Sequence, residues 1–236
     1  MNAAPHASAT ARPHWQRALR HGSLVLGGAL TLLVLAAALL SLWWTPWSPF
    51  AMDMGQRLAP PGAAHWLGTD AFGRDVASLL LVGARSSLLA GVVAVGIGLV
   101  IGTALGLLAA ARRGWVEELV MRLADFSFAF PAVLSAILFT AAWGPGLVNA
   151  IVAIGIFNIP VFARVARAGA LAVWSREYVL AARACGKGML RTTLEHVLPN
   201  IAPMLIVQAT VQFALAILAE AALSYLGLGT QPPQPS

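Results

Sequence analysis

The side chains best placed to do chemistry lie in the last apolar run of this 236-residue chain. Three polar residues, Gln208, Gln212 and Glu220, recur there at offsets that fall on one face of a helix. Polar groups inside a membrane-spanning helix usually face the bundle interior or a water-filled path. The spacing therefore predicts either a face that lines a translocation pathway or interhelical hydrogen bonds that serve packing alone.

No catalytic constellation accompanies these residues. Lys187 lies between two glycines, but Gly188 occupies the position where a phosphate-binding loop needs Ser or Thr. The five histidines show no paired ligand spacing and Cys185 is the only cysteine, so we expect no structural metal site. We therefore expect a chain that is not an enzyme and holds no cofactor. Energy would come from another chain or from an ion gradient.

A second informative segment, residues 175–200, lies between two apolar runs. Its pattern predicts a short helix through Ala184, a turn at Gly186 and a second short helix that ends before Pro199. One side of the first helix carries Tyr178, Ala181, Ala182 and Cys185. A compact helical hairpin with a small-residue face suits docking into a groove of a soluble protein. The alternative is a hairpin that lies on lipid.

The composition indicates the solvent around these elements. Hydrophobic residues make up 59% of the chain and charged residues 10%, against about 25% charged in soluble domains. Five apolar runs are each near the ~20 residues that a bilayer requires: 23–44, 87–111, 123–143, 147–169 and 201–228. The alternating segments of a β-barrel are missing from the sequence. We expect an all-α polytopic membrane bundle with five spans.

The basic residues predict how this bundle is oriented. Twelve of the 15 Lys and Arg residues lie in the N-terminal tail and in segments 112–122 and 164–191. The positive-inside rule then places the N-terminus in the cytoplasm. This topology also accounts for the net charge of +6, so we expect no nucleic-acid partner. The expected order is a cytoplasmic tail (1–22), a first membrane helix (23–44), an external segment (45–86) and a transmembrane domain (87–236) with a cytoplasmic loop at about 170–200.

Small residues recur at every fourth position of the second apolar run. They are Ala90, Ala94, Gly98, Gly102, Gly106 and Ala110. On a helix they form a ridge, almost free of side chains, along which another helix can approach closely. We expect Gly98, Gly102 and Gly106 to carry this contact. The helix that meets them lies either in this chain or in a partner chain.

Several segments resemble a known family. Ala181-Ala182, Gly186 and Leu198-Pro199 are similar to the cytoplasmic EAA loop of ABC-importer permeases, although Leu180 occupies the position of the glutamate that names the loop. A second block, from His65 through Gly73-Arg-Asp75 to Leu88, resembles the external segment of the dipeptide, oligopeptide and nickel permeases. Further blocks continue this similarity from about residue 65 to residue 236.

The resemblance implies the type I ABC importer permease fold and a role in the bacterial inner membrane. Such a subunit pairs with a second homologous permease, two cytoplasmic ATPases that bind ATP and Mg, and a periplasmic solute-binding protein. The EAA loop would seat on an ATPase, with Glu177 and Tyr178 beside the residues that match the motif. The expected cargo is a peptide, while nickel or another small solute stays open.

Two other functions remain to be distinguished at this point. An ion-coupled secondary transporter would show several intramembrane charges, and a non-transporting membrane assembly protein would need no docking loop. Co-purification with an ATPase discriminates against both. The resemblance also calls for six spans where five are present, so we expect the natural product to have roughly another 40 residues with one more ~20-residue span.

Overall fold

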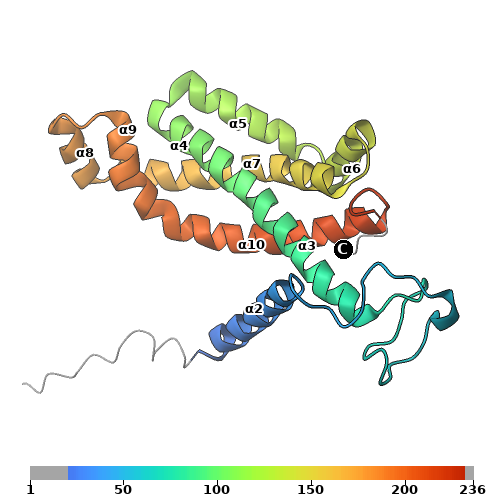
Figure 1. Cartoon of the computed structure of the whole chain (residues 1–236). Helices are drawn as coiled ribbons and strands as arrows, with labels where there is room; N and C mark the ends of the chain where they lie inside the picture. Colours follow the sequence, from blue (N-terminus) through green and yellow to red (C-terminus); the bar gives the residue numbers. More distant parts are fainter. Residues whose placement is uncertain (1–20, 232–236) are drawn as a thin grey trace, which may run out of the picture.

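The structure is a computed structural model that describes residues 21–231 (Figure 1). Over these residues no β-strand forms, and a single bridge joins Thr69 to Asp75. The helices are α2 (Gly22–Leu40), α3 (Val76–Ile97), α4 (Thr103–Arg112), α5 (Gly114–Phe128), α6 (Ala132–Trp143), α7 (Leu147–Trp174), α8 (Glu177–Ala184), α9 (Met189–Thr192) and α10 (Leu198–Tyr225). Shorter turns are the 3-10 turn η1 (Met54–Gln56) and the π-helical turns η2 (Gly98–Gly102) and η3 (Thr193–Val197).

The expected all-α membrane bundle is confirmed. In the described part of the chain, four helical stretches are long and apolar enough to cross a membrane: 22–40, 76–112, 147–174 and 189–225. The pair α5 and α6 makes a fifth if a bent pair counts as one span. The predicted tail, 1–22, lies almost wholly outside the described residues.

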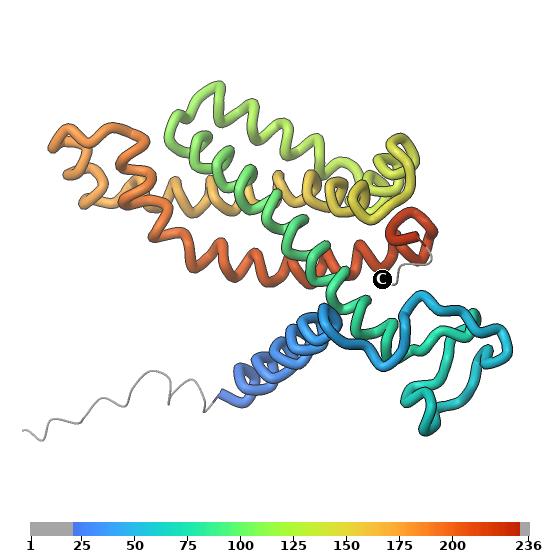
Figure 2. The backbone as a smooth tube through the Cα atoms, in the orientation of Figure 1, coloured from blue at the N-terminus to red at the C-terminus, as the bar shows by residue number. Residues whose placement is uncertain are grey.

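The third apolar run, predicted as a helix over 123–143, is not one continuous helix. The chain breaks after Phe128, and α5 meets α6 at a bend of 86°. Pro131 explains the break, because proline lacks the amide hydrogen that a continuing helix needs and restricts the residue before it. The bend turns α6 back toward α7, so this region wraps around a neighbouring helix and does not run straight past it (Figure 2).

Other predicted boundaries also need correction. The first helix ends at Leu40 and not at residue 44. The external segment expected over 45–86 includes the first turns of α3, and Asp75 caps this helix by accepting a 2.8 Å hydrogen bond from the amide of Ser78. The second helix of the hairpin does not end before Pro199, because the π-helical turn η3 shifts the hydrogen-bond register ahead of the proline. The last long helix ends at Tyr225, three residues earlier than expected.

The glycine ridge packs against α7 of the same chain. A Cβ on Gly98 would overlap Asn158, and one on Gly102 or Gly106 would overlap a backbone carbonyl oxygen of α7. Only glycine allows backbones to approach so closely. The stretch α3–η2–α4 therefore crosses α7 in direct backbone contact, and this crossing holds the centre of the bundle together.

Polar contacts order the segment between α2 and α3 (residues 41–75). The carboxylate of Asp75 lies 2.9 Å from His65 Nδ1 and accepts a 2.8 Å hydrogen bond from Ser78 Oγ. Burial alone would raise the pKa of Asp75, but the hydrogen bonds from Ser78 and His65 outweigh burial and hold that pKa below its usual range. The pKa of Asp70 is lowered in the same way, because hydrogen bonds from Arg74 and Phe72 outweigh burial.

The molecule has two distinct ends (Figure 1). The start of α2, the α4–α5 connection and the α8–α9 hairpin lie toward one end. The 41–75 segment, α6 and the close of α10 lie toward the other. The basic residues of the α4–α5 connection and of the hairpin thus lie toward the same end of the bundle, as a membrane protein with short basic loops on one side requires.

Candidate functional site

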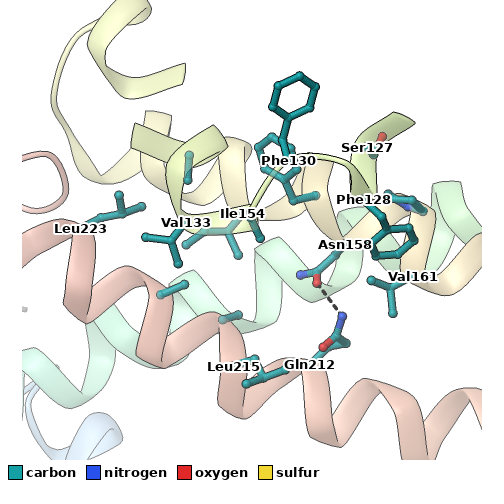
Figure 3. Close-up of a pocket in the computed structure, with 16 residues that line it drawn as sticks. Ser127, Phe128, Phe130, Val133, Ile154, Asn158, Val161, Gln212, Leu215 and Leu223 are labelled. Carbon is teal, nitrogen blue, oxygen red and sulfur yellow. Dashed lines mark hydrogen bonds between the residues drawn. The ribbon is translucent and has the colours of Figure 1, made fainter. Parts of the chain in front are cut away.

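A cavity of about 180 Å³ lies between the α5–α6 bend, α7 and α10 (Figure 3). Two helix interruptions shape it. Pro131 turns α6 over the cavity, and Pro160 within α7 removes a hydrogen bond from the helix ladder. Most of the lining side chains are apolar, and the polar ones are Ser127, Asn158 and Gln212. The cavity is thus an apolar chamber that contains a few amide and hydroxyl groups.

An amide pair joins α7 to α10 at this cavity. Gln212 Nε2 donates a 3.0 Å hydrogen bond to Asn158 Oδ1 (Figure 3). The two side chains are 7% and 8% exposed. Asn158 Nδ2 has no hydrogen-bond partner in the described part of the chain. Gly98 lies directly against the Cβ of Asn158, so the glycine ridge also fixes the position of this amide.

The structure does not bring the three predicted pathway residues into one chamber. Gln212 lines the cavity, whereas Gln208 is half-buried and lies outside its lining. Glu220 is 1% exposed, and its Oε1 accepts hydrogen bonds from Ser224 Oγ at 2.8 Å and Thr230 Oγ1 at 3.1 Å. Glu220 is placed to hold the turn after α10 in position. The three residues do share one helical face, but the twelve residues from Gln208 to Glu220 span about 18 Å along the axis.

Asn158 is the residue that sequence reasoning missed. The available signal was an asparagine inside an apolar run, two residues before Pro160. Polar residues within membrane helices are candidates for interhelical bonds or for function. The pairing with Gln212 could not be read from the sequence, because the two residues lie 54 positions apart.

The α8–α9 hairpin carries the predicted coupling residues at the surface. Glu177, Tyr178, Ala181, Gly186 and Pro199 are exposed, while Ala182 and Leu198 are half-buried. Gly186 has φ +85, which is the left-handed turn conformation that favours glycine.

Two fully buried valines anchor this hairpin. Val179 in α8 and Val197 in η3 are 0% exposed and belong to the hydrophobic core. Lys187 and Arg191 donate to Glu195 at 2.6 and 2.5 Å and tie the turn to the following helix. Leu180, where the EAA glutamate would stand, is 51% exposed. The hairpin is therefore a fixed projection whose outer face lacks a partner within the described chain.

The described residues offer no constellation for metal binding. No group of three or more His, Cys, Asp or Glu side chains comes together between residues 21 and 231.

Comparison with known proteins gives the family. The family of binding-protein-dependent transport system inner membrane components matches residues 102–236. This chain belongs to that family. It is 39% identical over 225 residues to the glutathione transport system permease protein GsiD of Pectobacterium atrosepticum, covering 95% of this chain and 75% of the relative. It is 43% identical over 228 residues to the di/tripeptide transport system permease protein DppC of Pseudomonas aeruginosa, covering 94% and 75%.

A solved structure supports the fold independently. A chain of the MetNI methionine ABC transporter in an inward-facing conformation superposes with a TM-score of 0.59 at 22% identity, covering 64% of this chain and 76% of that chain. At this identity the likeness concerns the fold alone. The predicted family resemblance and the type I importer permease fold are confirmed.

Proposed function

We propose that this chain is the membrane-spanning subunit of an ATP-driven importer that takes a small peptide from an external binding protein into the cytoplasm. The observation that carries the proposal is the α8–α9 hairpin. Its core side is fixed by buried Val179 and Val197, and its outer face is exposed. A rigid projection of this kind transmits movement between a soluble partner and the bundle without local unfolding.

The partners follow from the family and from the chemistry that the chain lacks. A second permease would pair with the bundle, two ATPases would bind ATP and Mg at the hairpin end, and a solute-binding protein would deliver cargo at the other end. The basic residues of the α4–α5 connection and of the hairpin lie toward one end, which favours a cytoplasmic N-terminus in the inner membrane.

Peptide cargo is favoured over nickel by two observations. Relatives about 40% identical are named as glutathione and di/tripeptide permeases. The cavity beside α10 also contains side-chain amides, whereas a transition metal ion would require imidazole, thiolate or carboxylate ligands.

Docking of the ATPase can be tested at the turn of the hairpin. Gly186→Asp adds a side chain where φ is +85 and a charge at the expected contact. We expect it to abolish co-purification of the ATPase and peptide uptake while the chain still inserts in the membrane. Gly188→Asp is the matched control, because Gly188 has φ −68 and accepts a side chain without strain. Undiminished coupling in an inserted Gly186→Asp variant would contradict the proposal.

A further inference from the structure

The cavity beside α10 holds a hydrogen-bond donor and an acceptor that the protein leaves unused. Asn158 Nδ2 is buried, and no described residue forms a hydrogen bond with it. Gln212 uses its Nε2 to bond Asn158 Oδ1, and its Oε1 has no hydrogen-bond partner among residues 21–231. Both side chains line the cavity (Figure 3). One amide donor and one amide acceptor therefore stand next to each other in an apolar chamber.

Packing alone does not account for this arrangement. A buried polar group without a partner costs about 1–3 kcal/mol, whereas two apolar side chains of the same shape would fill the space at little cost. The neighbours fix the amides in place: Gly98 packs against Asn158 Cβ, and the Pro131 bend and Pro160 shape the chamber. A preorganised polar pair with free capacity points to a ligand that completes it.

The donor and acceptor together identify the chemistry of that ligand. A peptide group presents one C=O and one N–H, which complement Asn158 Nδ2 and Gln212 Oε1. Between residues 21 and 231 no charged side chain lines the cavity, so it suits an uncharged amide better than a metal ion or a charged terminus. Apolar walls that include Phe128, Ile154 and Leu215 can accept an aliphatic side chain.

We propose that Asn158 and Gln212 form a binding site for the peptide group of the cargo during its passage, an inference that rests on the proposed peptide-import function. The volume of about 180 Å³ accommodates one residue of a small peptide and not a whole oligopeptide. The site would thus bind the backbone of the cargo with little selectivity for its sequence, since neither amide can distinguish one side chain from another.

The test uses the complete importer, with its partner permease, ATPases and binding protein, reconstituted in lipid vesicles. The probes are dialanine and its ester analogue alanyl-lactate, in which oxygen replaces the peptide N–H. The affinity of the binding protein for each probe is measured separately, and each probe is supplied at saturation. We expect the natural importer to carry about ten times as much dialanine as ester for each ATP hydrolysed. The ester lacks the N–H that would donate to Gln212 Oε1, so one buried hydrogen bond is lost.

The protein side of the test replaces both amides by apolar residues of similar shape. The double variant Asn158→Leu/Gln212→Met should import dialanine about tenfold more slowly and no longer discriminate between the two probes. Thr140→Val is the matched control. It also removes a buried polar group, but Thr140 bonds only to carbonyls of its own helix and does not line the cavity. Its uptake ratio should stay at the natural value.

If the natural chain and the double variant discriminate equally between dialanine and the ester, the proposed binding site is wrong. Absence of ATP-dependent uptake by the natural complex would instead overturn the proposed function, so the two failures are distinguishable.

A labelling experiment covers the case in which the double variant fails to assemble. In a Cys185→Ser background, Leu215→Cys lines the cavity and Leu218→Cys does not, although both native leucines are more than half exposed. An N-bromoacetyl dipeptide should label position 215 during turnover and leave position 218 unlabelled. Equal labelling would contradict the site.

Discussion

The crossing of α3–η2–α4 over α7 and the α8–α9 hairpin are built on opposite principles. At the crossing, glycines without side chains of their own let one backbone lie directly against carbonyl oxygens and Cβ atoms of α7. At the hairpin, buried Val179 and Val197 secure one side, and the other side presents exposed Tyr178 and Leu180. The crossing is completed by the chain itself, whereas under the proposed function the hairpin is completed by a partner. A larger side chain should therefore impair folding at the crossing and assembly with a partner at the hairpin.

The largest effect is expected at the crossing. Gly102→Ala should destabilise the bundle by about 1–3 kcal/mol, because a Cβ there overlaps the Ile159 carbonyl and backbone cannot yield. The measurement is thermal unfolding of the purified protein in detergent. Gly96→Ala is the matched control: nothing lies within 4 Å of its Cβ position, so it should be neutral or gain up to ~1 kcal/mol from helix propensity. Equal unfolding temperatures for Gly102→Ala and Gly96→Ala would contradict the role of the crossing in stability.

A smaller loss is expected at the turn that closes α10. Thr230→Val removes the hydrogen bond to Glu220 Oε1 but keeps the one from Ser224 Oγ. We expect a loss of about 1 kcal/mol, since one buried hydrogen bond is removed and its carboxylate acceptor stays partly satisfied. Hydrogen exchange of residues 224–231 should accelerate, with the α4–α7 crossing unchanged as internal reference. Unchanged exchange at this turn would show that Glu220 does not hold it.

At the hairpin a large insertion should leave stability almost unchanged. Ala181 is exposed, so Ala181→Trp should shift the free energy of unfolding by no more than about 0.5 kcal/mol. The added ring should nevertheless obstruct the docking surface and abolish co-purification of the ATPase. If thermal unfolding shifts as much as in Gly102→Ala, the hairpin is a packed part of the bundle and the contrast fails.

The smallest effect at neutral pH is expected in the 41–75 segment. Hydrogen bonds of polar side chains order this segment, whereas close backbone packing orders the glycine crossing. The pKa of Asp70 and of Asp75 is lowered from 3.8, so their stabilising contribution is complete above that pH and is lost as pH falls through the lower folded values. We expect pepsin to cleave this segment more readily as pH drops below about 3.8. Asp75→Asn should be cleaved readily even above that range, and Asp53→Asn is the control. A cleavage rate independent of pH would contradict this role.

Much of this protein is determined by local sequence. Long apolar runs must be helices in lipid, because every backbone group there needs an internal hydrogen bond. Glycine at every fourth position predicts a close helix contact, and Gly186 predicts a turn. The ordered blocks from residue 65 onward indicate the family. These features depend on periodicity and on single residue types, which a sequence states directly.

Only the tertiary structure decided the partners of these features. The glycine ridge could face α7 or another chain, and packing resolved it as α7. A run that looked like one span became α5 and α6, because a proline break that hydropathy does not register let α6 fold back. Gln212 was separated from Glu220 and joined to Asn158, since residues on one helical face can lie at different depths. Which groups meet across a bundle depends on how helices cross, and no local pattern encodes that crossing.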